Sequence, residues 1–285
     1  MTAVVVRQHA DANAFLAAAE GWLLEREAAH NLILGIVGAL RESSEGYGHP
    51  IYLATVEAQG SVAGCAFRTP PFKVGLTELP EGSGEALARD LARVYGEIPA
   101  VLGPPEAARA VGAAWSRIKG VTARDGMAQR IYALDSVTMP STMPRGFMRP
   151  AVEKDLGLVV DWLGRFMAET ALRGAAPDRL ATGLIATGAL ALWEDGGPVA
   201  MAGFSGSTPN TVRVSYVFTP EERRGSGYAT ALVAHLSRYL LETRCRQCVL
   251  YTDLGNPTSN GIYQRIGYRP VSDALDVVFS RDGVT

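Results

Sequence analysis

The stretch from Val217 to Val233 constrains the fold most, because it joins a strand-like run to a helix through glycines. It reads V-F-T-P-E-E-R-R-G-S-G-Y-A-T-A-L-V. β-Branched and aromatic residues precede the proline, and small and apolar residues recur at helical spacing after the second glycine. The N–H groups and dipole at the start of such a helix favour an anion, and glycines let it approach closely. The stretch therefore predicts a phosphate-binding turn, with two arginines adding positive charge at its mouth.

Composition sets the class of protein. The chain has 285 residues, of which 47% are hydrophobic and 20% charged, and its net charge is −2. These values are typical of a globular protein with room for two domains. We find no basic cluster suited to nucleic acid or an anionic membrane, no apolar run of about 18 residues and no signal-peptide pattern. We expect a cytoplasmic monomer or homodimer that binds neither nucleic acid nor membranes.

The three cysteines do not indicate a metal site. Cys65 stands alone, while Cys245 and Cys248 form C-R-Q-C. A zinc site would need another pair or histidines at ligand spacing, and none follows. A redox motif is expected to open a helix, whereas this one precedes a strand, so we favour structural cysteines over a metal or redox role.

The two halves of the chain share one order of expected elements: a strand, two helices, a hairpin, a strand, a helix, a strand, a helix and closing strands. This order indicates a duplicated α/β architecture, with two mixed-sheet modules of about six to seven strands each and flanking helices. The Pro-rich segment at 139–146 is the expected linker between domains 1–138 and 147–285. The first half carries only L-P-E-G-S-G-E-A at 79–86, with Glu85 where an anion would avoid an acid. We expect the second half to carry the chemistry.

Two motifs resemble those of one enzyme family. The string from Arg224 to Ala229 fits R/Q-x-x-G-x-G/A between a strand and a helix, and resembles motif A of the GNAT superfamily of acetyl-CoA-dependent N-acetyltransferases. A dinucleotide site would need a third glycine where Thr230 stands, and the lysine of a Walker loop is missing. The stretch 250–271, L-Y-T-D-L-G-N-P-T-S-N-G-I-Y-Q-R-I-G-Y-R-P-V, resembles GNAT motif B. The resemblance covers about 147–285 and implies a tandem protein with a degenerate N-terminal GNAT-like half.

The resemblance implies a site for acetyl-CoA as cosubstrate. The pyrophosphate would lie on the N–H groups of Ser226 to Thr230, and the pantetheine arm would pair with the main chain of the strand before the turn. That strand would splay from 247–252, and an N–H near Val217 would face the thioester oxygen. The implied cosubstrate-binding residues are Val217, Thr219, Arg224, Gly225, Ser226, Gly227, Tyr228, Ala229, Thr230, Asn256 and Asn260.

Tyr263 matches the family's tyrosine that protonates the leaving thiolate. It shares a helical face with Asn256 and Asn260. A phenol with a pKa near about 10 can donate to a thiolate whose conjugate thiol has a pKa of about 8.5. The alternative is an aromatic residue that packs on the sheet. No general base is assigned, because strand 211–219 carries no carboxylate.

The resemblance implies an acyltransferase that moves an acetyl group from acetyl-CoA to a primary amine of a small molecule or aminoacyl compound by direct attack. The first half and the loops around 165–188 and 205–210 would wall the acceptor site. Transfer of a longer acyl group is one alternative. The other is a CoA-binding sensor or scaffold without turnover, which the missing strand carboxylate keeps open.

Overall fold

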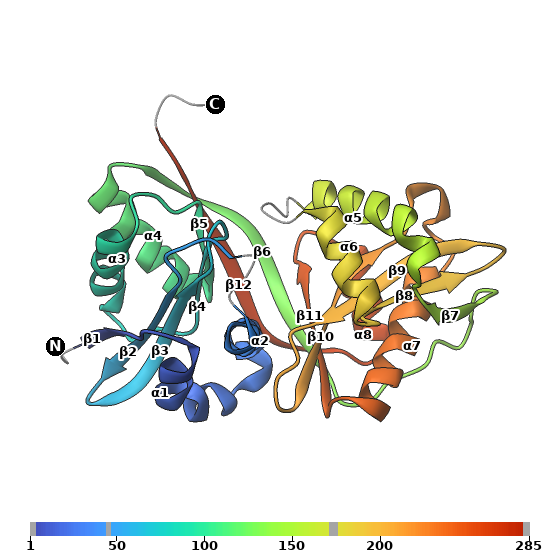
Figure 1. The fold of residues 1–285 in the computed structure, drawn as a ribbon, viewed down its shortest axis with the longest axis horizontal. Helices are drawn as coiled ribbons and strands as arrows, with labels where there is room; N and C mark the ends of the chain where they lie inside the picture. The colour runs from blue at the N-terminus through green and yellow to red at the C-terminus, as the bar shows by residue number, and fades with distance from the viewer. Residues whose placement is uncertain (1–3, 44–46, 171–175, 282–285) are drawn as a thin grey trace. The chain divides into compact units, whose positions relative to one another are not determined.

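The computed structural model describes residues 4–43, 47–170 and 176–281 (Figure 1). They form two compact units that are not contiguous in sequence. Unit 1 takes the described part of residues 1–131, 253–255 and 271–285, and unit 2 takes that of 132–252 and 256–270. Strand β6 (Thr122–Leu134) therefore begins in unit 1 and ends in unit 2, whereas β12 (Arg269–Ser280) runs from unit 2 into unit 1.

Unit 1 is a mixed sheet with helices on both faces. Its strands follow the order β1-β2-β3-β4-β5-β12. Most neighbours are antiparallel, and β4 and β5 run parallel. Its other elements are β1 (Val4–Gln8), α1 (Ala12–Leu24), α2 (Glu27–Glu42), β2 (Tyr52–Ala58), β3 (Ser61–Arg68), β4 (Val74–Leu76), α3 (Ser83–Val94), β5 (Ala100–Gly103) and α4 (Pro105–Lys119).

The alternation of side chains along β2 separates the two cores of unit 1. Tyr52, Ala54 and Val56 belong to the core formed with α3 and α4. Leu53 lies between them in sequence and belongs to the core formed with α1 and α2. Successive residues of a strand point to opposite faces, so the two helix pairs cover opposite faces of this sheet.

Unit 2 repeats this plan. Its strands follow the order β6-β11-β10-β9-β8-β7. In Figure 1, α5 and α6 lie to one side of these strands and α7 to the other. Its elements are β7 (Phe147–Pro150), α5 (Leu156–Thr170), α6 (Pro177–Ala186), β8 (Leu190–Glu194), β9 (Pro198–Ser205), β10 (Thr211–Phe218), α7 (Tyr228–Thr243), β11 (Gln247–Asp253) and α8 (Pro257–Arg265). The predicted α/β class with two mixed-sheet modules is confirmed.

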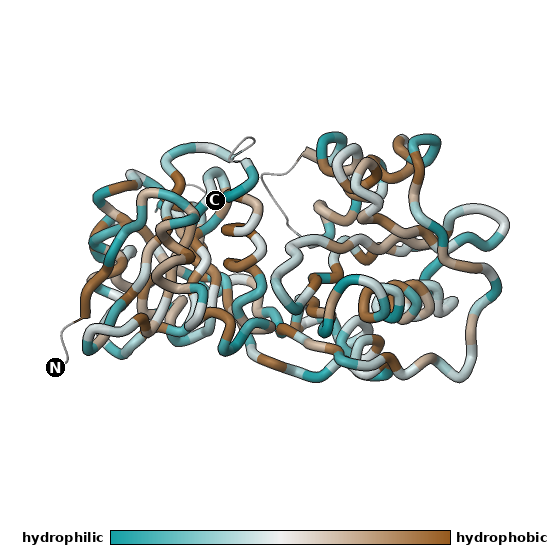
Figure 2. The backbone as a smooth tube through the Cα atoms, turned by 60° about the horizontal axis from the view of Figure 1, so that its bottom comes forward, coloured by the Kyte–Doolittle hydropathy of each residue, from teal (hydrophilic) through white to brown (hydrophobic). Residues whose placement is uncertain are grey.

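Large apolar side chains hold unit 2 together. Leu163, Trp193, Leu232 and Tyr268 are at most 2% exposed within one continuous core. Figure 2 shows hydrophobic residues concentrated in strands and along helices, with many connecting loops hydrophilic. Burial of each such side chain contributes roughly 1.5–3 kcal/mol, so packing rather than any single polar contact holds the unit.

The unit boundaries differ from the predicted domain ranges. The expected linker at 139–146 lies within unit 2. Residues 132–138 belong to unit 2, whereas residues 253–255 and the described residues from Val271 onward belong to unit 1. The cause is strand pairing across a long stretch of sequence: Leu275 of β12 lies opposite Gly103 of β5. The closing strands that we expected at the end of the second half form one continuous strand, β12.

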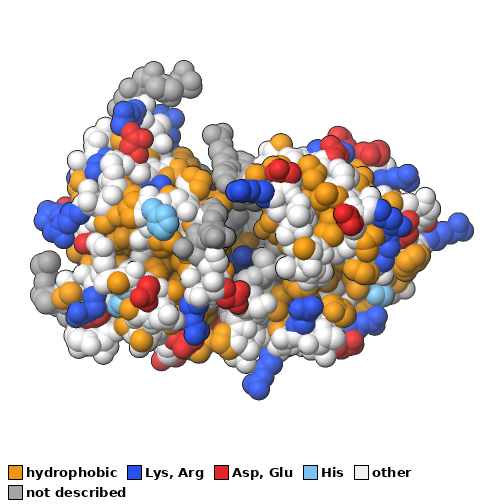
Figure 3. Space-filling model, viewed as in Figure 1, with side chains coloured by type: hydrophobic (Ala, Val, Ile, Leu, Met, Phe, Trp, Pro, Cys, Tyr) orange, Lys and Arg blue, Asp and Glu red, His pale blue; other side chains and the backbone are white. Residues whose placement is uncertain are grey.

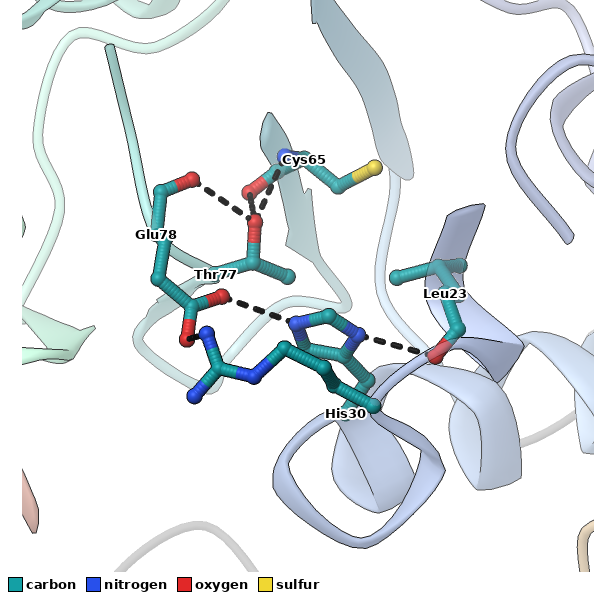
Figure 4. A network of polar contacts seen from close by, with 6 residues as sticks. Leu23, His30, Cys65, Thr77 and Glu78 are labelled. Atoms are coloured by element: carbon teal, nitrogen blue, oxygen red, sulfur yellow. Dashed lines mark hydrogen bonds and ion pairs between the residues drawn. The ribbon is translucent and has the colours of Figure 1, made fainter. Parts of the chain in front are cut away.

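A buried polar network joins α1 and α2 to the end of β4 in unit 1 (Figure 4). His30 is 3% exposed, its ring stacks on Trp22, and both ring nitrogens face acceptors. Nδ1 lies 2.9 Å from the carbonyl oxygen of Leu23, and Nε2 lies 2.8 Å from Oε2 of Glu78. Glu78 also pairs with Arg26. The hydrogen bond from His30, with help from Arg26, lowers the pKa of Glu78 from 4.5 to about 2.

The surface carries charges of both signs, as the near-neutral net charge of −2 indicates. Figure 3 shows basic and acidic side chains interspersed over one face. Among the described residues, no helix combines the length and apolar character needed to cross a bilayer.

Candidate functional site

The glycine turn between β10 and α7 has the geometry of an anion site. Gly225 and Gly227 have φ of 80° and 82°, a region that favours glycine. Gly227 is the N-cap of α7, and no side chain caps the helix. The first helical hydrogen bond runs from the N–H of Ala231 to the carbonyl oxygen of Gly227 (3.0 Å). The N–H groups of the intervening first turn are therefore directed at whatever lies before the helix.

The side chains around this turn are already engaged. The guanidinium of Arg224 donates to both carboxylate oxygens of Glu169 at 2.7 and 2.9 Å, and its Nε donates to the carbonyl oxygen of Thr219 at 3.0 Å. The hydroxyl of Tyr228 donates to Asp195 at 2.6 Å, which ties the turn to the β8–β9 connection. Arg224 thus braces the turn through Glu169 in this structure, and the uncapped N–H groups at the start of α7 remain the candidate anion-binding groups.

Strands β10 and β11 pair only at their beginnings. The parallel register joins Thr211 to Gln247, Val212 to Cys248 and Arg213 to Val249. Beyond Arg213 no further pair is found in the described part of the chain, although β10 continues to Phe218 and β11 to Asp253. Parallel strands that stop pairing leave main-chain N–H and C=O groups that another extended segment can bind.

A β-bulge lies in β10 beyond the segment that pairs with β11. The register with β9 joins Ser215 to Gly203 but Phe218 to Met201, so β10 has one extra residue there. Tyr216 adopts φ of 54° within this bulge. A Cβ on Gly203 would lie 3.0 Å from Cδ2 of Tyr216, so the neighbouring glycine makes room for it. Bulges redirect the main chain and concentrate near active sites.

Sequence reasoning missed this bulge. The only available signal was Gly203, a glycine inside a strand pattern, which can mark a bulge or a close approach of another chain. On either side of the bulge, the hydroxyl oxygens of Ser215 and Thr219 are buried without a hydrogen-bond partner among the described residues. Thr219, which we expected to bind through its main chain, thus also brings an unsatisfied hydroxyl to this end of β10.

The motif B residues lie at the start of α8. Asn256 is its N-cap, and its Oδ1 accepts from the N–H of Ser259 at 3.0 Å. Asn260 accepts from the hydroxyl of Tyr132 at 3.0 Å and donates to the carbonyl oxygen of Asn256 at 2.8 Å. Both asparagines therefore shape the helix start in this structure, and Asn260 also links it to β6.

Tyr263 lies on the buried side of α8. It is 7% exposed, and its ring centroid lies 6.5 Å from that of Tyr132 and 6.0 Å from that of Tyr268. Burial raises the pKa of Tyr263 to about 12. The hydroxyl therefore keeps its proton at neutral pH, as a proton donor must, while the ring packs in the core of unit 2.

The acidic side chains near β10 have structural partners. Glu194 accepts from Arg149 at 2.8 Å, and Asp253 accepts from the N–H of Gly255 at 2.8 Å. Glu222 is exposed and lies 3.9 Å from Arg165. No group of three or more potential metal ligands occurs among the residues that the structure describes.

Unit 1 has a glycine turn like that of unit 2, but its neighbouring residues do not suit an anion. Gly82 is the N-cap of α3 with φ of 79° and no capping side chain, which matches Gly227 rather than Gly225. The following glycine serves packing, since a Cβ on Gly84 would lie 2.9 Å from Ala110. Glu85, in the first turn of α3, pairs with Arg89 and Arg117. An acid thus occupies the place where an anion would bind.

Comparison with known families gives this geometry a context. Residues 159–268 match the model of the Acetyltransferase (GNAT) family. Residues 159–268 thus form a GNAT acetyltransferase domain. The match runs from within α5 to just past α8, and so includes the turn, strands β10 and β11, and Tyr263. No curated protein matches the chain.

Solved structures extend the GNAT fold to the whole chain. A tandem GNAT protein from the clavulanic acid biosynthesis pathway has a TM-score of 0.53 at 16% identity, covering 99% of this chain and 100% of the other. A GCN5-related N-acetyltransferase from Sphaerobacter thermophilus has 0.58 at 18%, covering 99% and 97%. A Drosophila protein has 0.67 at 15%, covering 97% and 99%. At these identities the likeness concerns the fold, which is that of two GNAT modules in tandem.

The coarse chemistry follows from the family. GNAT acetyltransferases generally use acetyl-CoA, and the family's activity is acyl transfer.

Proposed function

We propose that this protein is an N-acetyltransferase that moves an acetyl group from acetyl-CoA to a primary amine of a small molecule or aminoacyl compound by direct attack. The observation that carries the proposal is the loss of pairing between β10 and β11 after Arg213 and Val249. It leaves an extended main chain open just before an uncapped glycine turn.

The residues of this region fit the cosubstrate. The first-turn N–H groups of α7 suit a pyrophosphate, because no side chain occupies the cap. The main chain around Val217 and Thr219 suits a pantetheine arm that adds to β10 as a strand would. Predicted anchoring by Asn256 would use its amide Nδ2, since its Oδ1 caps α8.

Each residue then has a defined role. Acetyl-CoA supplies an activated acetyl thioester. An N–H at the bulge near Val217 would donate to the thioester oxygen and stabilise negative charge that develops there. Tyr263, which stays protonated because burial raises its pKa, would donate a hydrogen bond to the departing sulfur. Substrate amines that arrive neutral would reduce the need for a protein base.

The test uses the purified chain with acetyl-CoA and a panel of primary amines, each matched with the corresponding alcohol. Mass spectrometry of the acceptor reports the gain of one acetyl group, which is independent of the protein's own cysteine thiols. We expect acetylated amines and unmodified alcohols. Acetylated alcohols without acetylated amines would contradict the N-acetyl assignment.

The second candidate is a CoA-binding sensor or scaffold, favoured by the absence of a carboxylate on β10. Calorimetric titration with CoA separates the two. Binding of CoA without acetylation of any amine would favour the sensor, and absence of binding would contradict both functions.

A further inference from the structure

The C-R-Q-C segment brings two thiols together at the junction of α7 and β11. Cys245 follows the C-cap of α7, and Cys248 lies in β11. Their sulfur atoms are 3.9 Å apart. A disulfide needs a separation of about 2.05 Å, so the two sulfurs would have to approach by about 2 Å.

The two thiols differ in access to solvent. Cys248 is fully buried, whereas Cys245 is partly exposed. The thiol of Cys245 donates to the carbonyl oxygen of Leu240 at 3.5 Å, and that of Cys248 to the carbonyl oxygen of Ser237 at 3.6 Å. Both thiols therefore contact carbonyl oxygens of the last turns of α7, and only Cys245 is partly exposed.

We propose that Cys245 and Cys248 form a reversible dithiol–disulfide pair, oxidised by a low-molecular-weight disulfide such as glutathione disulfide. The spacing alone favoured structural cysteines, and the sulfur separation together with the unequal exposure changes that interpretation. The proposal does not depend on acyl transfer.

The exchange balances in two steps. The thiolate of Cys245 attacks one sulfur of glutathione disulfide, the glutathione S–S bond breaks, and one glutathione leaves with the proton that Cys245 lost. Cys248 then loses its proton and attacks the sulfur of Cys245, and the second glutathione leaves. Two protein thiols are oxidised, and one glutathione disulfide is reduced to two thiols.

The pKa shifts of the two thiols also indicate that Cys245 attacks before Cys248. The contact with Cys248 lowers the pKa of the Cys245 thiol, and the main-chain groups of Gln247 and Val212 lower it further. The same contact and burial raise the pKa of the Cys248 thiol. The thiolate is the nucleophile, so Cys245 reacts first and Cys248 resolves the mixed disulfide.

The location gives the disulfide a structural effect. Cys248 lies opposite Val212 in the short paired segment of β10 and β11. A bond to Cys245 would tie the end of α7 to that segment, at the paired end of the two strands.

The test exposes the folded, reduced chain to glutathione disulfide, quenches with acid, alkylates free thiols and maps peptides without reduction. We expect a Cys245–Cys248 link that dithiothreitol reverses. Cys65, fully buried with a pKa raised by burial to about 12, should remain alkylatable after unfolding and serves as the internal control.

Two conservative variants test the order. Cys248→Ser should accumulate one glutathione on Cys245, and Cys245→Ser should slow reaction at Cys248 about tenfold or more. A stable glutathione adduct on Cys245 of the unmutated chain, or no reaction at either cysteine while the unfolded chain reacts, would overturn the proposal.

Discussion

At the scale of single residues, Tyr263 has a buried ring and is also the residue that we propose to donate to the departing thiolate. Its contacts with Tyr132 and Tyr268 suit packing, and its raised pKa of about 12 suits a donor that stays protonated. The two roles are compatible, because the ring and the hydroxyl serve different purposes.

We predict that Tyr263→Phe lowers kcat about a hundredfold, since general acid catalysis contributes about 10² or more. The KM for acetyl-CoA and the thermal midpoint should change little, because phenylalanine keeps the ring contacts. Steady-state kinetics across about pH 6–9 check this. Because this range lies below the pKa of Tyr263, deprotonation of Tyr263 should not lower kcat as the pH rises. An unchanged kcat would leave the tyrosine with a packing role only.

The charge of Glu78 links the stability of unit 1 to pH. Its folded pKa is depressed from 4.5 to about 2, first by the hydrogen bond from His30. A depressed carboxyl pKa adds stability above the unfolded value, and this stability is lost as pH falls through the folded value. The relevant window therefore lies between about pH 4.5 and pH 2.

We predict that Glu78→Gln costs about 1–2 kcal/mol near neutral pH, a modest value because a third of the Glu78 side chain is exposed. The difference from the unmutated chain should shrink as pH falls through that window. Urea unfolding at several pH values measures it, with Glu97→Gln, which removes an exposed pair with Arg281, as control. A pH-independent difference would rule out the linkage.

At the scale of elements, the two glycine turns offer a matched pair. Gly227 and Gly82 cap α7 and α3 with nearly equal φ, and neither has a capping side chain. Only the turn at Gly227 follows a strand that has a bulge and stops pairing with its parallel neighbour before its end.

We predict that Gly227→Val abolishes detectable acetyl-CoA binding, because the side chain would stand over the first-turn N–H groups. Gly82→Val should bind normally. Both should lose roughly 1–2 kcal/mol of stability, since valine is strained at positive φ. Calorimetric titration and urea unfolding measure the two effects, and equal affinities in the two variants would contradict the assigned turn.

Short-range sequence patterns predicted the helices and strands well. They did not predict contacts between residues far apart in the sequence. The strand, turn and helix from Val217 to Val233 and the β8–β9 hairpin follow from short-range spacing and turn residues. The bulge at Tyr216 depends on Gly203 in the neighbouring strand. The capping role of Asn256 competes with ligand binding for the same side chain, so the motif alone could not separate them.

At the scale of the whole molecule, residues near the C-terminus complete the core of unit 1. Val277 is 3% exposed and belongs to the core formed with α3 and α4, whereas its neighbour Val278 is 41% exposed. A Cβ on Gly112 of α4 would lie 2.6 Å from Val277, which shows how closely they pack.

We predict that Val277→Ala destabilises unit 1 by about 2 kcal/mol, through lost burial and the resulting cavity. Val278→Ala should cost less than about 0.5 kcal/mol. Hydrogen exchange resolves the location: peptides of β2 and α3 should lose protection in the first variant, while those of β8 and β9 should not. Equal loss in both units would contradict a local effect.

Strand β12 is synthesised long after β5, so the sheet of unit 1 can be completed only late in protein synthesis. Gly103 of β5 meets its partner Leu275 only after the whole of unit 2 has been made. At about 5–20 residues per second, a ribosome needs roughly 10–30 s to cover that distance. Throughout this interval the nascent N-terminal sheet has an open edge at β5, which closes only when β12 has been made.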